Sequence, residues 1–253
     1  MALFDIDPLL NAMLDTAPGI SDLNLSVGRP PQVEIDGALH AVPYAGIQRL
    51  MPYHTELIAL RLLGGKRDLA DKLLRTGSTD LSYSLAKRTR FRVNVFSQRG
   101  SYSIVLRVIP NKIPSVADLG LPAQLNDIAH ERNGIVLLTG PTGSGKSTTL
   151  AAIIRKMNEE KPIHIITIED PIEYLHQSIK ATINQREVGT DTQTFALALR
   201  AALRQAPKVI LVGEMRDVET ISIALEASET GHLAPSTLHP IDDAKATDRI
   251  VAG

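Results

Sequence analysis

A glycine-rich stretch in the second half of the chain constrains the fold more than any other feature of the sequence. Residues 140–147 read GPTGSGKS and match the pattern G-x-x-x-x-G-K-[ST] without a gap. The apolar run at residues 135–139 precedes them and is typical of a parallel strand buried on both faces. Residues 148–157 follow and can form a helix. A chance glycine turn would not bring this strand and this helix with it, so the stretch predicts a P-loop that binds phosphate.

The residue types of this loop suit a nucleotide. Glycines let backbone N–H groups approach phosphate oxygens because no side chain stands in the way. We expect the Lys146 ammonium to reach the outer phosphates and the Ser147 hydroxyl to bind Mg²⁺. The positive end of the following helix faces the same anion. The predicted nucleotide-binding residues are Gly140, Pro141, Thr142, Gly143, Ser144, Gly145, Lys146, Ser147 and Thr148.

The first part of the chain, residues 1–109, has a different pattern. Apolar and polar residues alternate in several short runs, which is typical of strands with one face in the core and one face in water. Asp36-Gly37 lies between two such runs and predicts a tight hairpin turn. The pattern predicts a small α+β domain with an antiparallel sheet, with strands at residues 21–27, 32–35, 38–42, 79–86, 90–98 and 101–109 and helices at residues 8–14, 55–63 and 68–74.

A second domain is predicted from residue 118 to residue 253. Residues 110–117 contain Pro110 and Pro114 and show no clear period, which indicates a linker. Beyond the linker, strands and helices alternate, and this alternation favours an α/β fold with a mostly parallel sheet and helices on both faces. The predicted strands are residues 135–139, 163–168, 209–212 and 233–238, and the predicted helices are residues 118–129, 146–157, 194–205 and 218–230.

Composition excludes several classes of protein. The formal net charge is −1, so nothing in the overall charge predicts a nucleic-acid partner or an anionic membrane. Cysteine is absent, which excludes a disulfide framework and a thiolate metal site. No apolar run approaches the roughly 20 residues of a membrane span, and the N-terminus is acidic where a signal peptide is basic. We therefore expect a cytoplasmic protein.

Carboxylates follow two of the predicted strands, at the sheet edge where ligands bind in such folds. Glu214 comes directly after the buried run at residues 208–213, where a water-positioning group or a metal ligand acting through water belongs. Glu169 ends another strand, close to Asp170 and Glu173, and is a candidate for the same two roles. A loop carboxylate in water is the alternative for Glu214, and a turn-capping role is the alternative for Asp170. Aspartate is the commoner residue at the strand end, where this chain has Gly213.

Two histidines and two arginines are further candidates. His232 and His239 bracket the last predicted strand, and each is a candidate for sensing the γ-phosphate, although a histidine in a loop is as often structural. If the strands that carry Arg92 and Arg107 pair in antiparallel fashion, the two side chains lie together. The pattern alone favours a solvated face for them, and as arginine fingers they would have to reach the phosphates from another domain or subunit.

Several motifs together resemble one protein family. The chain is similar to the PilT-type pilus retraction ATPases of the type II/IV secretion ATPase superfamily. The resemblance covers nearly the whole chain in order, with matching stretches at residues 21–31, 36–37, 90–94, 98, 140–150, 167–173, 184–188, 210–217 and 229–239.

The resemblance implies a PAS-like N-terminal domain, a RecA-like ATPase domain and a homohexameric ring. It assigns Glu169 to the aspartate box, Glu214 to an atypical Walker B motif in which glycine is expected at position 213, and His232 and His239 to the histidine box. It also places Arg92 and Arg107 at the arginine-finger positions. The implied reaction is hydrolysis of ATP to ADP with Mg²⁺ between two domains. The implied partners are an inner-membrane pilus platform protein and other pilus ATPases, and the implied location is peripheral at the inner membrane.

The chain departs from the family pattern at several positions, namely Asn24, residues 206–208, Ala234, Pro235 and Pro240. Family members also continue past this point with a helical segment, so the C-terminal part is expected to be truncated. Two alternatives to a retraction motor remain: a pilus assembly or type II secretion ATPase, and a non-hydrolysing nucleotide-binding regulator of such a motor.

Overall fold

The computed structural model describes residues 5–44, 46–86, 88–110 and 112–238. The chain divides into two compact units, Met1–Ile109 and Pro110–Gly253. Each unit has its own sheet and its own buried apolar core. In the described residues, no helix has the length and the apolar character needed to cross a membrane.

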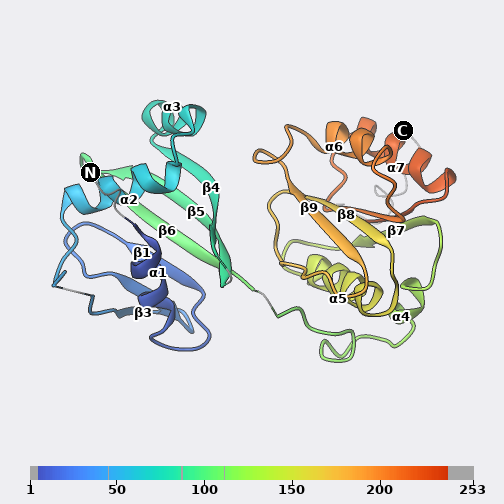
Figure 1. Ribbon diagram of the computed structural model, residues 1–253, viewed down its shortest axis with the longest axis horizontal. Helices are drawn as coiled ribbons and strands as arrows, with labels where there is room; N and C mark the ends of the chain where they lie inside the picture. The colour runs from blue at the N-terminus through green and yellow to red at the C-terminus, as the bar shows by residue number, and fades with distance from the viewer. Residues whose placement is uncertain (1–4, 45, 87, 111, 239–253) are drawn as a thin grey trace. The chain divides into compact units, whose positions relative to one another are not determined.

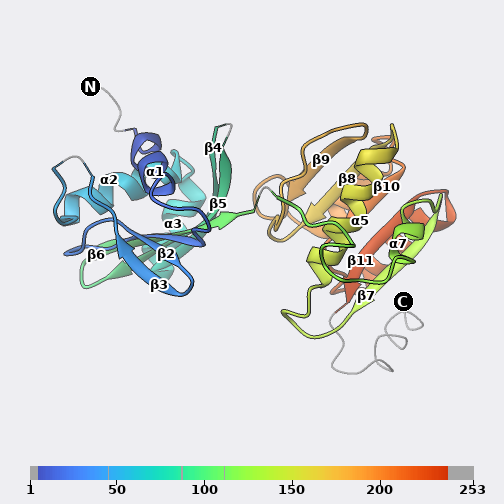
Figure 2. The ribbon, with the colours of Figure 1, turned by 90° about the horizontal axis from the view of Figure 1, so that it is seen from below.

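The first unit is built on a six-stranded sheet in the order β3-β2-β1-β6-β5-β4, and all of its pairings are antiparallel (Figures 1 and 2). Along β5, Phe91, Val93 and Val95 are fully buried, whereas the residues between them are more exposed. This is the alternation that the sequence predicted. The strands are β1 (Asp22–Leu25), β2 (Gln32–Ile35), β3 (Ala38–Ala41), β4 (Ser78–Leu85), β5 (Thr89–Gln98) and β6 (Ser101–Ile109), and the helices are α1 (Asp7–Leu14), α2 (Pro52–Leu63) and α3 (Arg67–Thr76).

The predicted hairpin turn is present between β2 and β3. Asp36 and Gly37 both have positive φ, 50° and 79°, and they connect the paired residues Ile35 and Ala38. Two successive residues with positive φ form the type of two-residue turn that matches the twist of the flanking strands. Asp-Gly is a favoured sequence for this turn because both residues tolerate the left-handed region.

The second unit contains a five-stranded sheet in the order β7-β11-β10-β8-β9, and every pairing in it is parallel. Helix α5 covers one face, and α6 and α7 cover the other (Figure 1). The predicted α/β fold with a parallel sheet is therefore confirmed. The strands are β7 (Gly134–Thr139), β8 (His164–Glu169), β9 (Thr182–Glu187), β10 (Val209–Val212) and β11 (Leu233–Leu238), and the helices are α4 (Leu125–Ile128), α5 (Lys146–Glu160), α6 (Phe195–Ala202) and α7 (Val218–Glu229).

Three expectations for this unit were wrong. The helix predicted at residues 118–129 is reduced to the single turn α4, because Gly120 takes a left-handed φ of 64° and Pro122 follows it. Strand β9 was not predicted, because its mostly polar residues lack the apolar pattern of a strand although it forms the edge of the sheet. The first strand of the motif, β7, is half-buried rather than buried on both faces, because it lies at the other edge of the described sheet.

Strand β11 forms in spite of Pro235. It pairs with β7 along its whole length, from Leu233 opposite Gly134 to Leu238 opposite Thr139. It pairs with β10 on either side of the proline, at Leu233 and at Ser236. Proline has no N–H to donate, so the sheet accommodates it as a local gap on one side of a fully buried strand.

Candidate nucleotide-binding site

The candidate site lies at the carboxyl edge of the parallel sheet, where loops from several strands meet. The P-loop follows β7, Glu214 follows β10, and Glu169 is the last residue of β8. Strand β11 separates β7 from β10. Adjacent strands are about 4.8 Å apart, so the P-loop strand and the Glu214 strand end about 10 Å from one another. The fold therefore gathers the predicted phosphate-binding and carboxylate groups at one edge.

Lys146 is held inside the curve of the P-loop. Its Nζ donates to the carbonyl oxygens of Gly140 and Pro141, both at 2.9 Å, and the residue is only 8% exposed. Carbonyl oxygens satisfy the donors of the ammonium but do not neutralise its charge. Residues 141–145 around it are exposed. The loop thus surrounds a positive charge on a surface that an anion can reach.

Glycine is required at two positions of this loop. Gly140 has a φ of 146°, and a Cβ there would come within 2.9 Å of Ser144 Oγ. Gly145 has a φ of 90° and directly precedes α5. Side chains rarely adopt these left-handed conformations, so the turn from strand to helix depends on glycine.

The N-terminus of α5 is open to an anion. The helix has 15 residues, Gly145 provides no capping side chain, and the first turn contains no acidic residue. The first N–H groups of a helix have no partner within the helix, and the helix dipole makes this end positive. Ser147 and Thr148 lie in this first turn, and the Thr148 hydroxyl is 3.1 Å from the Tyr174 hydroxyl. The end of the helix therefore complements the Lys146 charge.

Glu214 is buried rather than exposed in a loop, with 8% of its surface accessible. Arg216 Nη2 lies 2.5 Å from Glu214 Oε1, and this hydrogen bond raises the pKa of the Arg216 guanidinium. The turn before it is fixed by Thr237, whose Oγ1 donates to the Gly213 carbonyl oxygen at 2.6 Å. The alternative of a solvated loop carboxylate is excluded for this residue.

The structure gives a physical reason for glycine at position 213. A Cβ on Gly213 would lie 3.2 Å from the carbonyl oxygen of Ile168 and 3.3 Å from Glu169 Cα. The Gly213 N–H also donates to that carbonyl at 2.7 Å. The two carboxylate-bearing strand ends approach so closely that a side chain between them would push them apart.

Glu169 is held by neighbours on two strands. Its Oε1 accepts hydrogen bonds from Thr167 Oγ1 at 2.5 Å and from Gln185 Nε2 at 3.1 Å, and its Oε2 accepts from the Glu173 N–H at 3.5 Å. Burial raises the pKa of the Glu169 carboxyl above its ordinary value, and these three hydrogen bonds oppose the rise. Asp170 beside it is exposed. Glu169 is therefore a partly buried, oriented carboxylate.

Sequence reasoning about single residues missed the groups that support these carboxylates. Gln185, Tyr174 and Arg216 each contact a predicted site residue or its support. All three lie in or beside stretches that resemble the family motifs, but their polarity alone did not distinguish them from surface residues. Gln185 could have been found only by predicting β9 as an edge strand, because its pairing with β8 places Gln185 opposite Thr167.

The donor set at this edge suits Mg²⁺. Among the described residues, no group of three or more His, Cys, Asp or Glu side chains could hold a metal ion by itself. Mg²⁺ in nucleotide sites keeps several waters and takes phosphate oxygens with one or two protein ligands. The Ser147 hydroxyl in the first turn of α5 is suited to bind it directly, and Glu214 and Glu169 are suited to act through water.

His232 does not lie at this edge. It directly precedes β11, and its carbonyl accepts the N–H of Gly134 at the amino end of β7. Its Nδ1 lies 3.0 Å from the Ala227 carbonyl oxygen, as in a helix-end contact. A six-residue strand at about 3.3 Å per residue places it about 20 Å from the carboxyl edge. His239 lies outside the described residues.

Arg92 and Arg107 lie side by side in the first unit, as the predicted pairing required. They are opposite residues on β5 and β6. The Arg107 side chain is 69% exposed, and its Nε lies 3.0 Å from Oδ1 of Asp22 on β1. Both arginines belong to the wet face of the sheet, and their role as arginine fingers stays a prediction.

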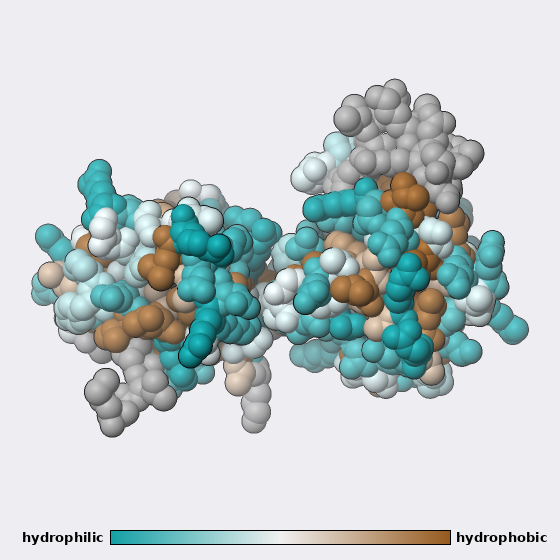
Figure 3. Space-filling model, turned by 90° about the horizontal axis from the view of Figure 1, so that it is seen from above, coloured by the Kyte–Doolittle hydropathy of each residue, from teal (hydrophilic) through white to brown (hydrophobic). Residues whose placement is uncertain are grey.

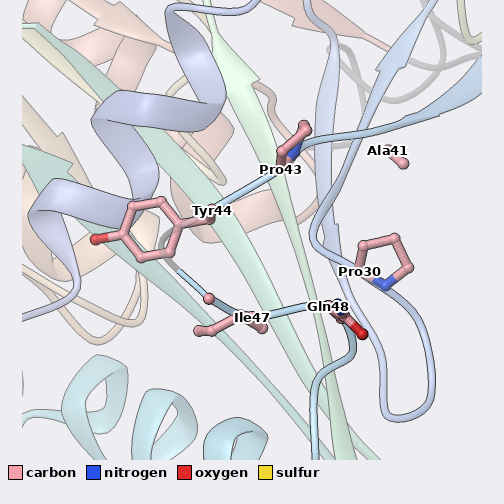
Figure 4. A pocket seen from close by; sticks show the side chains of 7 residues that line it. Pro30, Ala41, Pro43, Tyr44, Ile47 and Gln48 are labelled. Atoms are coloured by element: carbon pink, nitrogen blue, oxygen red, sulfur yellow. The ribbon is translucent and has the colours of Figure 1, made fainter.

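A pocket in the first unit is not part of the nucleotide site. It has a volume of about 430 Å³ and lies near Pro30, Pro43, Tyr44, Ile47 and Gln48 (Figure 4). Its lining is mostly apolar, with neither a glycine-rich loop nor a cation. Figure 3 shows apolar side chains scattered among polar ones on the surface of both units. The charge that complements a phosphate lies at the P-loop instead, on Lys146.

Comparison with known proteins gives consistent matches. A type IV pilus retraction ATPase, PilT, of Pseudomonas aeruginosa is 45% identical over 92% of this chain and 66% of its own length. A twitching motility protein of Neisseria gonorrhoeae is 55% identical over 68% of this chain and 46% of its own length. This chain therefore spans less than two thirds of either relative.

A solved structure matches closely as well. The crystal structure of the pilus retraction motor PilT with bound ADP has a TM-score of 0.85 and 46% sequence identity, over 98% of this chain and 71% of that one. The model of the family described as type II/IV secretion system protein matches residues 32–252. That match includes the P-loop, both strand-end carboxylates and the paired arginines. The chain thus belongs to the type II/IV secretion system protein family.

Proposed function

We propose that this chain is the ATP-hydrolysing core of a motor that drives type IV pilus retraction. The observation that carries the proposal is the buried Glu214 at the same sheet edge as the P-loop with its enclosed Lys146. The relatives named as retraction and twitching proteins support retraction as the direction of the motor. The PilT structure that resembles this chain contains ADP, which supports an adenine nucleotide as ligand.

In this proposal, the residues at the carboxyl edge of the sheet have separate roles in hydrolysis. The loop amides, Lys146 and the first turn of α5 bind the phosphates, and Glu214 orients a water molecule toward the γ-phosphorus. As that oxygen–phosphorus bond forms, the bond from the γ-phosphorus to the β,γ-bridging oxygen breaks, and its electron pair leaves on that oxygen of ADP. The proton that the water loses passes to an oxygen of the released phosphate. Arg216 keeps the Glu214 carboxylate in place through their ion pair. Bound Mg²⁺ would neutralise charge on the phosphate oxygens.

The finer parts of the proposal concern assembly and place. In this account the first unit is a PAS-like domain whose Arg92 and Arg107 stabilise charge on phosphates bound by another domain or subunit. The working form is a homohexamer that acts on an inner-membrane platform protein from the cytoplasmic side, together with other pilus ATPases. His232 and His239 belong to this account only through the family resemblance.

The test is steady-state ATP hydrolysis and molar mass in solution, with Lys146→Ala as the key variant. Loss of the ammonium removes charge-assisted contacts worth about 3 kcal/mol, which is a loss of about 100-fold in nucleotide affinity. Lys156→Ala is the matched control, since Lys156 lies on the same helix and pairs with Glu160 at the surface. Hexamers with Lys146-dependent turnover support a motor core. Nucleotide binding without turnover in the unaltered chain would instead favour the regulator.

A further inference from the structure

Gln185 lies next to Glu169 on the neighbouring strand. In the parallel pairing of β8 with β9, Gln185 is opposite Thr167, two residues before Glu169. Residues that are opposite one another, and residues two apart, project from the same face of a sheet. Gln185 Nε2 donates to Glu169 Oε1 at 3.1 Å. The amide and the carboxylate are therefore neighbours by sheet register rather than by a flexible loop.

Two further hydrogen bonds fix the orientation of the Gln185 amide. Its Nε2 also donates to the carbonyl oxygen of Tyr174 at 2.9 Å, and its Oε1 accepts the N–H of His176 at 2.8 Å. A backbone carbonyl can only accept and a backbone N–H can only donate. Reversing the amide would break both contacts, so the NH₂ group has to face Glu169.

The two carboxylate oxygens of Glu169 differ in the hydrogen bonds that they accept. Oε1 accepts two hydrogen bonds, from Thr167 at 2.5 Å and from Gln185. Within the part of the chain that the structure describes, Oε2 accepts only a long one, 3.5 Å, from the Glu173 N–H. A buried carboxylate without donors is costly. Gln185 thus helps anchor Oε1 and leaves Oε2 with capacity for water or a hydrated ion.

The same amide connects Glu169 to the phosphate end of the site. The Tyr174 carbonyl oxygen accepts a hydrogen bond from Gln185. The hydroxyl of the same tyrosine lies 3.1 Å from Thr148 Oγ1 in the first turn of α5. A continuous series of contacts therefore runs from the P-loop helix through Tyr174 and Gln185 to the strand-end carboxylate. These contacts also fix the middle of the segment between β8 and β9, which contains Tyr174 and His176.

We propose that Gln185 is a positioning residue for ATP hydrolysis, which fixes the Glu169 carboxylate and ties it through Tyr174 to the helix that follows the P-loop. The inference rests on the proposed hydrolase function. It assigns Gln185 no contact with the nucleotide. Its removal should therefore lower the rate of turnover and leave nucleotide affinity unchanged.

The test compares kcat, and the affinity for a non-hydrolysable ATP analogue, in the full chain and in three variants: Gln185→Leu, Glu169→Gln and the double variant. Loss of a supporting residue of this kind costs about 10-fold to 100-fold in activity, so we expect such a fall in kcat for Gln185→Leu with unchanged affinity. The matched control is Asn184→Leu, because Asn184 neighbours Gln185 on β9 but contacts His164 on the opposite face. It should retain kcat.

The double variant separates positioning from general damage to the fold. If Gln185 acts through Glu169, adding Gln185→Leu to Glu169→Gln should lower kcat little further, since residues in one network are not additive. An equal fall in both backgrounds would overturn the proposal, and so would an unchanged kcat in Gln185→Leu. A wild-type chain without turnover would contradict the proposed function itself. The failure of the proposed function can therefore be distinguished from the failure of the role proposed for Gln185.

Discussion

The two units of this chain use charged residues in opposite ways. In the first unit, Arg107 is mostly exposed and pairs with Asp22 on the wet face of an antiparallel sheet. In the second unit, Lys146 and Glu214 are almost completely buried at the edge of a parallel sheet. Buried charges are costly unless they are paired and hydrogen-bonded. The second unit therefore carries an organised chemical site, whereas Arg107 of the first unit is paired but exposed at the surface.

This difference predicts that removing the paired arginines of the first unit alters activity more than stability. Removing Arg92 and Arg107 together should lower turnover by about 10³-fold, or about 4 kcal/mol of activation free energy, if they act as fingers. The free energy of unfolding should fall by about 1–3 kcal/mol, because Asp22 is only 7% exposed and loses its Arg107 partner. Steady-state hydrolysis and denaturant unfolding of Arg92→Ala with Arg107→Ala measure both quantities.

Arg75→Ala is the matched control for this prediction. Arg75 is also an exposed arginine of the first unit, on α3, where its Nε donates to the carbonyl oxygen of Asp71 in the same helix. It should leave turnover and stability unchanged. Normal hydrolysis in the double arginine variant would end the finger assignment and reduce the first unit to a structural domain.

The second unit should be the one whose stability depends on pH. His176 is partly buried, and this burial lowers its pKa from 6.5 to about 4. The unfolded chain binds this proton below pH 6.5, whereas the folded unit resists it down to about pH 4. The free energy of unfolding therefore has its full value above pH 6.5. It decreases by about 3 kcal/mol in total as the pH falls toward 4. Denaturant unfolding monitored in the second unit at pH 7.5 and pH 5 checks this.

His176→Gln should remove most of this pH dependence, because the substituted side chain does not titrate. His164→Gln is the comparison, since His164 has hydrogen-bond partners at both ring nitrogens. If the His176 variant loses stability between pH 7.5 and pH 5 as steeply as the wild type, another group controls the second unit.

Crowding at the strand ends predicts a smaller effect. Gly213→Ala introduces a Cβ 3.2 Å from the Ile168 carbonyl oxygen, and overpacking of this kind costs about 1–3 kcal/mol. The displaced Glu214 should lower turnover more than nucleotide binding. Thermal unfolding and hydrolysis of this variant measure the two effects, and a variant with wild-type stability and turnover would show that the strand ends are not tightly packed.

Much of the fold could be predicted because local sequence patterns determine it. The alternation of Phe91, Val93 and Val95 predicted β5, and Asp36-Gly37 predicted the hairpin turn between β2 and β3, since both patterns reflect backbone and burial requirements of neighbouring residues. The P-loop could be predicted for the same reason, because Gly140 and Gly145 meet conformational needs within a few residues of one another.

The misses share a non-local cause. Strand β9 exists because β8 pairs with it, and its polar residues carry no period of their own. The role of Gln185 therefore appears only when the register is known. His232 and His239 looked equivalent in the sequence because they bracket one strand, yet parallel pairing places His232 at the amino end of that strand, away from the P-loop.

The most direct test of the central claim is the turnover of Glu214→Gln at saturating ATP. The substituted amide keeps the size of the side chain but loses the charge that orients water, so turnover should fall by about 10²-fold to 10⁴-fold while ATP binding is retained. Glu173→Gln, an exposed carboxylate near the same edge, should retain full turnover. Undiminished hydrolysis by Glu214→Gln would contradict the account, since the buried carboxylate beside the P-loop would then not be the group that activates water.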